Sequence, residues 1–128
     1  MKASGSDIAR PYLEEAAKKL EKAKRLLEDR YYDESARCAY YAMHHAAKAL
    51  LALKGEEPRT HHGVISELQR LYVKTGEMGQ SFASSLARDL QVRIRVDYEV
   101  MVAVTKEMAE DIVNDAKGFI KEAKGFFK

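Results

Sequence analysis

Apolar residues recur every three or four positions near both ends of the chain, the spacing of amphipathic helices. The first stripe covers residues 8–29, where glutamate and lysine or arginine alternate on the other positions. The second follows Thr105, which is expected to cap the helix with its hydroxyl. Each pattern predicts a surface helix with one buried side.

Three further helices are expected between these two. The first begins after Asp33 and ends at Lys54, because Gly55 supplies the usual C-terminal stop. A loop should follow over residues 55–63, and it contains Arg59, His61 and His62. The other two helices are a short one that carries Val64, Ile65, Leu68, Leu71 and Tyr72 and ends near Gly76, and one that starts near Gln80.

The stretch "VDYEVMVAV", residues 96–104, can continue the fourth helix or form an extended connection, because its β-branched residues weaken a helix prediction. No β-strand and helix alternation and no glycine-rich phosphate loop occurs elsewhere. With 128 residues the chain has the size of one domain, residues 1–128. We therefore predict an all-α fold, an up-and-down antiparallel bundle of four to five helices.

Composition narrows the function only a little. The 22 basic and 20 acidic side chains are interspersed, so the sequence has no region of one charge sign that would predict nucleic-acid or membrane binding. The single cysteine, Cys38, excludes an internal disulfide and fits a cytoplasmic protein. No apolar segment approaches the roughly 20 residues that span a bilayer, so no membrane association is expected.

The predicted second helix has two faces. At 100° per residue, its core face gathers small and apolar residues: Ala39, Ala42, Met43, Ala46, Leu50 and Leu53. Around Arg37, on the opposite face, gather Tyr41, His44, Lys48 and Leu51, with Tyr40 to one side and His45 to the other. Arg37 and Lys48 are the only formal charges between Ser35 and Leu53, so we expect this face to be covered by another helix, a second subunit or a ligand.

The chain resembles the short prokaryotic branch of the HEPN family (higher eukaryotes and prokaryotes nucleotide-binding) in three segments. In chain order these are "RCAYYAMHHAAKALLALKG", "PRTHHGVISEL" and "RIRVDY". The resemblance covers roughly residues 10–125. It implies a bundle of four or five helices, a homodimer, no cofactor and often a nucleotidyltransferase partner in a toxin-antitoxin pair. It also implies metal-independent ribonuclease activity in members that carry an Arg-(4 to 6 residues)-His motif on a late helix.

The chain departs from that motif because it has no histidine after His62. The corresponding stretch holds Arg93, Asp97 and Tyr98, so whether the protein is an enzyme stays open; the catalytic candidates are His45, Arg93 and Asp97. The residues expected to bind a nucleotide or RNA are Arg37, Tyr41, His45, His61, Arg93 and Tyr98.

Each candidate also has a simpler interpretation. Arg93 and Asp97 are four residues apart and can form an ion pair within one helix. His61 and His62 can cap the third helix or lie in solvent. The two His-His pairs are not expected to bind metal, because adjacent helical residues diverge by 100° and no acidic partner is suitably spaced.

Three functions therefore stay open. The first is a nucleotide-, RNA- or partner-binding module, the second a divergent ribonuclease toxin, and the third a purely structural dimeric bundle.

Overall fold

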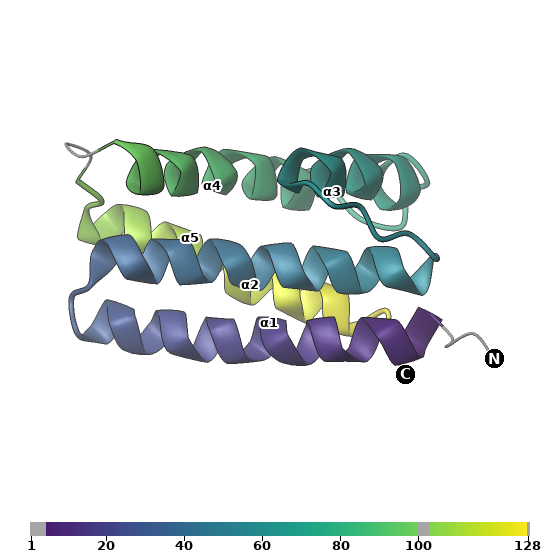
Figure 1. The fold of residues 1–128 in the computed structure, drawn as a ribbon, viewed down its shortest axis with the longest axis horizontal. Helices are drawn as coiled ribbons and strands as arrows, with labels where there is room; N and C mark the ends of the chain where they lie inside the picture. The colour runs from purple at the N-terminus through teal and green to yellow at the C-terminus, as the bar shows by residue number, and fades with distance from the viewer. Residues whose placement is uncertain (1–4, 100–102, 128) are drawn as a thin grey trace.

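The computed structural model describes residues 5–99 and 103–127, and these form α-helices and one short π-helix. The helices are α1 (Gly5–Glu28), α2 (Tyr32–Leu53), α3 (His61–Leu68), α4 (Gln80–Tyr98) and α5 (Lys106–Lys124), with the π-helix η1 (Gln69–Val73) directly after α3. The long helices α1, α2, α4 and α5 alternate in direction, and α3 lies beside the start of α4 (Figure 1). The predicted all-α up-and-down bundle is confirmed.

Helix α2 lies at the centre of the bundle and packs against α1, α4 and α5. This position explains its composition, since alanine lets neighbouring helices approach closely while larger side chains fill the spaces between them. Met43, Leu50 and Tyr40 are fully buried, so Tyr40 belongs to the core as well as to the edge of the polar face. Leu51, expected on the polar face, is also fully buried.

Three of the predicted helix starts are wrong. Helix α2 begins at Tyr32 rather than after Asp33, because Arg30 turns the chain with a φ of 66° and the Ser35 amide already donates to the carbonyl of Tyr31. Asp33 caps no helix; its carboxylate accepts a hydrogen bond from the Val104 amide, 71 positions away. Helix α1 begins at Gly5, three residues before the predicted start.

The third helix also starts earlier than predicted. Thr60 caps it by accepting a hydrogen bond from the Gly63 amide at 2.8 Å, so His61 and His62 are the first residues of α3 and not part of a loop. Helix α4 begins at Gln80 as expected and ends at Tyr98, after which Glu99 is extended. Of the ambiguous stretch, residues 100–102 lie outside the described residues. Thr105 caps α5 through the Met108 amide, as predicted.

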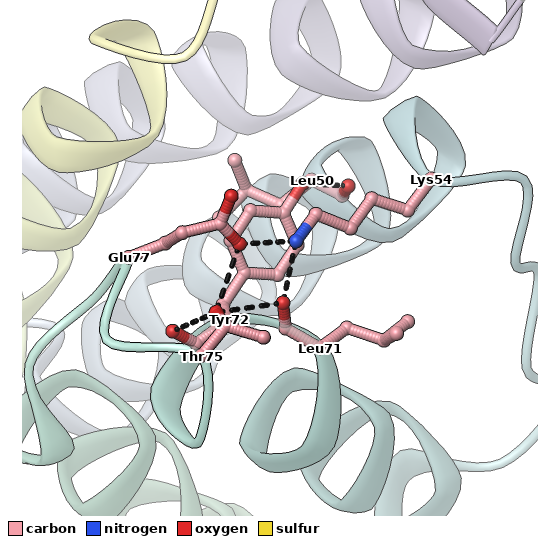
Figure 2. Close-up of polar contacts among 6 residues, drawn as sticks. All are labelled: Leu50, Lys54, Leu71, Tyr72, Thr75 and Glu77. Atoms are coloured by element: carbon pink, nitrogen blue, oxygen red, sulfur yellow. Dashed lines mark hydrogen bonds and ion pairs between the residues drawn. The ribbon is translucent and has the colours of Figure 1, made fainter.

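A set of polar contacts connects η1 and the turn after it to the end of α2 (Figure 2). Lys54 binds Glu77 and the carbonyl of Leu71, and its ammonium lies 4.1 Å from the centre of the Tyr72 ring. The Tyr72 hydroxyl donates to the carbonyl of Leu50 in α2. These contacts hold the turn that brings α4 back along the bundle.

Candidate functional site

The polar face of α2 is partly covered by other helices of the same chain. Arg93 of α4 lies over the Tyr41 ring, with its guanidinium carbon 5.5 Å from the ring centre. His61, at the start of α3, lies against His44 with ring centres 4.3 Å apart. Of the three expected covers, another helix of the bundle is therefore the one observed over these residues.

One carboxylate joins two arginines at this face. Arg37 Nε donates to Asp97 Oδ1 at 2.8 Å, and Arg93 Nε lies 2.9 Å from Asp97 Oδ2. The Arg93 contact is an ion pair without hydrogen-bond alignment, because this Nε has no aligned acceptor among the described residues. The predicted pair within α4 is thus present, and Arg37 of α2 joins it. Asp97 balances one of the two positive charges, which leaves the bridge of Arg37, Asp97 and Arg93 cationic.

The two histidines beside the bridge are neutral. Burial lowers the pKa of His44 to about 3, with a further contribution from His61. Burial is also the largest cause that lowers the pKa of His61, and Arg93 is the next. His44 Nδ1 is buried and has no hydrogen-bond partner among the described residues. The site thus concentrates arginine charge without adding imidazolium charge near neutral pH.

Tyr40 fixes the orientation of His61. The Tyr40 hydroxyl and His61 Nδ1 are 2.7 Å apart, and burial raises the pKa of Tyr40, so the hydroxyl keeps its proton. When the Tyr40 hydroxyl donates this hydrogen bond to Nδ1, the neutral ring of His61 carries its proton on Nε2 and can donate through it. In the other tautomer, His61 Nδ1–H donates to the Tyr40 oxygen and the unprotonated Nε2 can accept a hydrogen bond or a proton.

A cleft of about 470 Å³ opens between the start of α3 and the last turns of α4. Leu90 and Ile94 make an apolar part of its wall, and Arg93 brings a guanidinium whose side chain is only 18% exposed. Tyr98 stands at the cleft with 75% of its surface exposed. The other residues that line the cleft are Arg59, Thr60, His61 and His62. An apolar wall beside buried positive charge suits a ligand with a flat ring and an anionic group.

The structure brings most of the predicted ligand-binding residues together. Arg37, Tyr41 and Arg93 meet at the bridge, and the cleft holds His61 and Tyr98. His45 lies on the other side of Tyr41: its Nδ1 is 2.8 Å from the Tyr41 carbonyl oxygen and its ring faces Tyr12 at 6.5 Å, so it does not line the cleft. The sequence did not predict that Arg59, Thr60, His62, Leu90 and Ile94 line a ligand site. Tyr40 and His44 were expected at the polar face of the second helix but were not among the residues predicted to bind a ligand. Thr60, a residue type favoured as an N-cap, could have indicated that α3 starts at His61.

Two kinds of site can be tested against the described part of the chain. Within residues 5–99 and 103–127, no group of three or more histidine, cysteine, aspartate or glutamate side chains is placed to hold a metal ion. Over the same ranges, no helix is both long and apolar enough to cross a membrane. The polar side chains that line the cleft are those of Arg59, Thr60, His61, His62, Arg93 and Tyr98.

Fold and site define an all-α bundle with an arginine- and histidine-lined cleft. The HEPN domain family matches residues 9–126, and the chain belongs to this family. A UPF0332 protein of Archaeoglobus fulgidus is 34% identical over 112 residues, which cover 88% of this chain and 89% of that protein. A protein of Methanocaldococcus jannaschii named putative toxin MJ0605 is 33% identical over 116 residues, or 91% of this chain and 86% of its own. The resemblance to the HEPN family seen in the sequence is confirmed.

Proposed function

We propose that this HEPN module binds the phosphate of a nucleotide or of RNA in the cleft between α3 and α4. The observation that carries the proposal is the position of Arg93: it lines the cleft, is largely buried, and is only partly neutralised because Asp97 is shared with Arg37. A guanidinium in this setting binds an oxyanion with two parallel hydrogen bonds more strongly than an exposed lysine would.

The other walls of the cleft support a nucleotide rather than a bare anion. Ile94 and Leu90 offer apolar surface and Tyr98 offers an exposed ring, on which a base can stack. His61 adds a neutral donor or acceptor that can bind a ribose hydroxyl without repelling the phosphate. A nucleoside monophosphate is therefore the smallest ligand expected to occupy the cleft.

Thermal denaturation with and without adenosine monophosphate tests this proposal, because a ligand that binds only the folded state raises the melting temperature. Wild-type protein should show a rise that Arg93→Ala abolishes and Arg93→Lys reduces, since lysine keeps the charge but loses the planar fork. Arg95→Ala is the matched control, because Arg95 is an exposed arginine of the same helix that does not line the cleft. No rise with any nucleotide or RNA, or an equal rise in Arg93→Ala, would contradict the proposal.

The contact between Tyr40 and His61 favours a second candidate, a divergent metal-independent ribonuclease. With His61 Nδ1–H donated to the Tyr40 oxygen, the unprotonated Nε2 would take the proton of the ribose 2′-hydroxyl, and the 2′-oxygen would attack the adjacent phosphorus. The 5′-oxygen would leave with a proton from water, giving a 2′,3′-cyclic phosphate, while Arg93 stabilises the phosphate charge. Total RNA incubated with purified protein in EDTA should then be cleaved by wild type and left intact by His61→Gln. His45→Gln is the control, because His45 lies away from the cleft. Intact RNA with wild type would reject this candidate and leave the binding proposal standing.

The toxin names of the relatives in M. jannaschii are also compatible with a protein partner. We propose a homodimer and a nucleotidyltransferase encoded nearby as the two partners to test. Tyr98 is the side chain to change, because 75% of its surface is exposed and tyrosine is enriched at protein interfaces. Light scattering of wild type and Tyr98→Ser tests the dimer, and co-expression with a neighbouring nucleotidyltransferase followed by co-purification tests the second partner.

A further inference from the structure

A second hollow lies between α1 and α2, outside the cleft. It has a volume of about 390 Å³ and is lined by Lys19, Lys22, Leu26, Glu34, Arg37, Cys38 and Tyr41. Three of these side chains are cationic and one is acidic, so the groove is positively charged although the chain as a whole is nearly neutral. We call it the α1–α2 groove.

The groove and the cleft meet at the arginine bridge. Arg37 lines the groove and binds Asp97, whose other oxygen pairs with Arg93 of the cleft. Tyr41 lines the groove as well, and the Arg93 guanidinium lies over its ring. The two hollows are therefore neighbours on either side of one ion-paired bridge.

We propose that the cleft, the bridge and the α1–α2 groove form one track for a single-stranded RNA of several nucleotides. This inference rests on the proposed function and extends it from one phosphate to successive ones. Arg93 would bind the first phosphate, Arg37 would lie beside the next, and Lys19 and Lys22 would bind the backbone beyond it.

Aromatic rings placed along the same path favour a nucleic-acid strand over other polyanions. Tyr98 lies in the cleft and Tyr41 at the groove, so each hollow offers a ring beside its positive charges. Single strands are commonly bound in this way, with the backbone in a basic groove and bases stacked on aromatic side chains. An acidic peptide would use the positive charges but not the rings.

Oligoadenylates of about two to about ten nucleotides, labelled with a fluorophore and titrated by anisotropy, measure the length of the track. Affinity should rise with length and then level off once the strand spans both hollows. The double variant Lys19→Gln with Lys22→Gln should weaken binding of the longest strand and lower the slope of log K against log salt by about 1.4, about 0.7 for each lost phosphate contact. It should leave the melting-temperature rise with adenosine monophosphate unchanged.

The matched control changes another pair of lysines with the same spacing, Lys121→Gln with Lys124→Gln, which are exposed on α5. It should bind every strand like wild type. Affinity that does not grow with length, or a groove variant that binds like the control, would overturn the track while the mononucleotide result keeps the proposed function. Equal binding of a DNA strand or of a polyglutamate peptide would overturn the assignment to RNA. Failure of both adenosine monophosphate and the oligonucleotides would reject the proposed function itself.

Discussion

Replacing His44 by glutamine should make the fold less sensitive to acid. The His44 ring is largely buried against His61, and its Nδ1 has no hydrogen-bond partner among the described residues. Protonation would place a second positive group beside Arg93, which already lies close to both histidines. Burial is the largest cause that lowers the pKa of His44 to about 3, so the folded protein resists protonation here.

The sign of the effect follows from the two states of His44. An unfolded chain protonates this histidine near its ordinary pKa of 6.5, whereas the folded chain does so only near pH 3. The contribution of neutral His44 to stability is therefore complete above about pH 6.5 and is lost as the pH falls towards 3. At about pH 5 the loss amounts to at most about 2 kcal/mol, from about 1.4 kcal/mol for each pH unit below 6.5.

Urea denaturation followed by circular dichroism at about pH 5 and about pH 7.5 measures the free energy of unfolding in both conditions. His44→Gln should be less stable than wild type at the higher pH but should lose about 2 kcal/mol less on acidification. The control is His62→Gln, since His62 is exposed and should retain the acid response of wild type. An equal loss of stability in wild type and His44→Gln would show that His44 does not resist protonation in the folded state.

Three other substitutions test the surrounding structure. Lys54→Met should lower the free energy of unfolding by about 1–2 kcal/mol, because it removes the charge over the Tyr72 ring and the hydrogen bond to the Leu71 carbonyl. Urea denaturation measures this loss, and Lys74→Met is the control because Lys74 is exposed. Burial, followed by the neighbouring Asp115, raises the pKa of Asp89 well above the ordinary range of a carboxyl group, so wild type should lose stability as the pH rises above that range and Asp89→Asn should lose less. Urea denaturation at about pH 6 and about pH 9 measures this difference. Asp97→Asn removes the carboxylate that competes with a ligand phosphate for Arg37 and Arg93, so it should tighten the binding of adenosine monophosphate, measured by calorimetry. Unchanged or weaker binding would show that Asp97 does not compete with the ligand.

Local spacing was enough to predict the five α-helices and the buried side of α5. The stripe after Thr105 gives the cap and the buried side of α5, because both depend on residues a few positions apart. The start of α2 could not be predicted, since Asp33 looks like a cap but binds the amide of Val104 instead. A bond across 71 positions leaves no local periodic signal in the sequence.

In the candidate site, too, local spacing predicts some contacts, while others join residues that are distant in the sequence. The spacing of Arg93 and Asp97 predicts their ion pair, but it does not reveal that Arg37, 60 positions before Asp97, binds the same carboxylate. The pairing of Tyr40 with His61 depends on the connection after α2, which turns back so that α3 starts beside the middle of α2 (Figure 1). One sequence can give the faces of each helix, but which faces meet is decided by how the whole bundle packs.

The chain has no histidine after His62, but the folded bundle brings His61 to the same cleft as Arg93. Both carboxylate oxygens of Asp97 are engaged by arginines. His61 comes from the other wall of the cleft, is held by Tyr40 and is neutral, which are the properties that a proton-transferring group needs near neutral pH. If this protein cleaves RNA, the proton transfer belongs to the start of α3 and the charge stabilisation to α4, so the two functions can be separated by His61→Gln and Arg93→Lys.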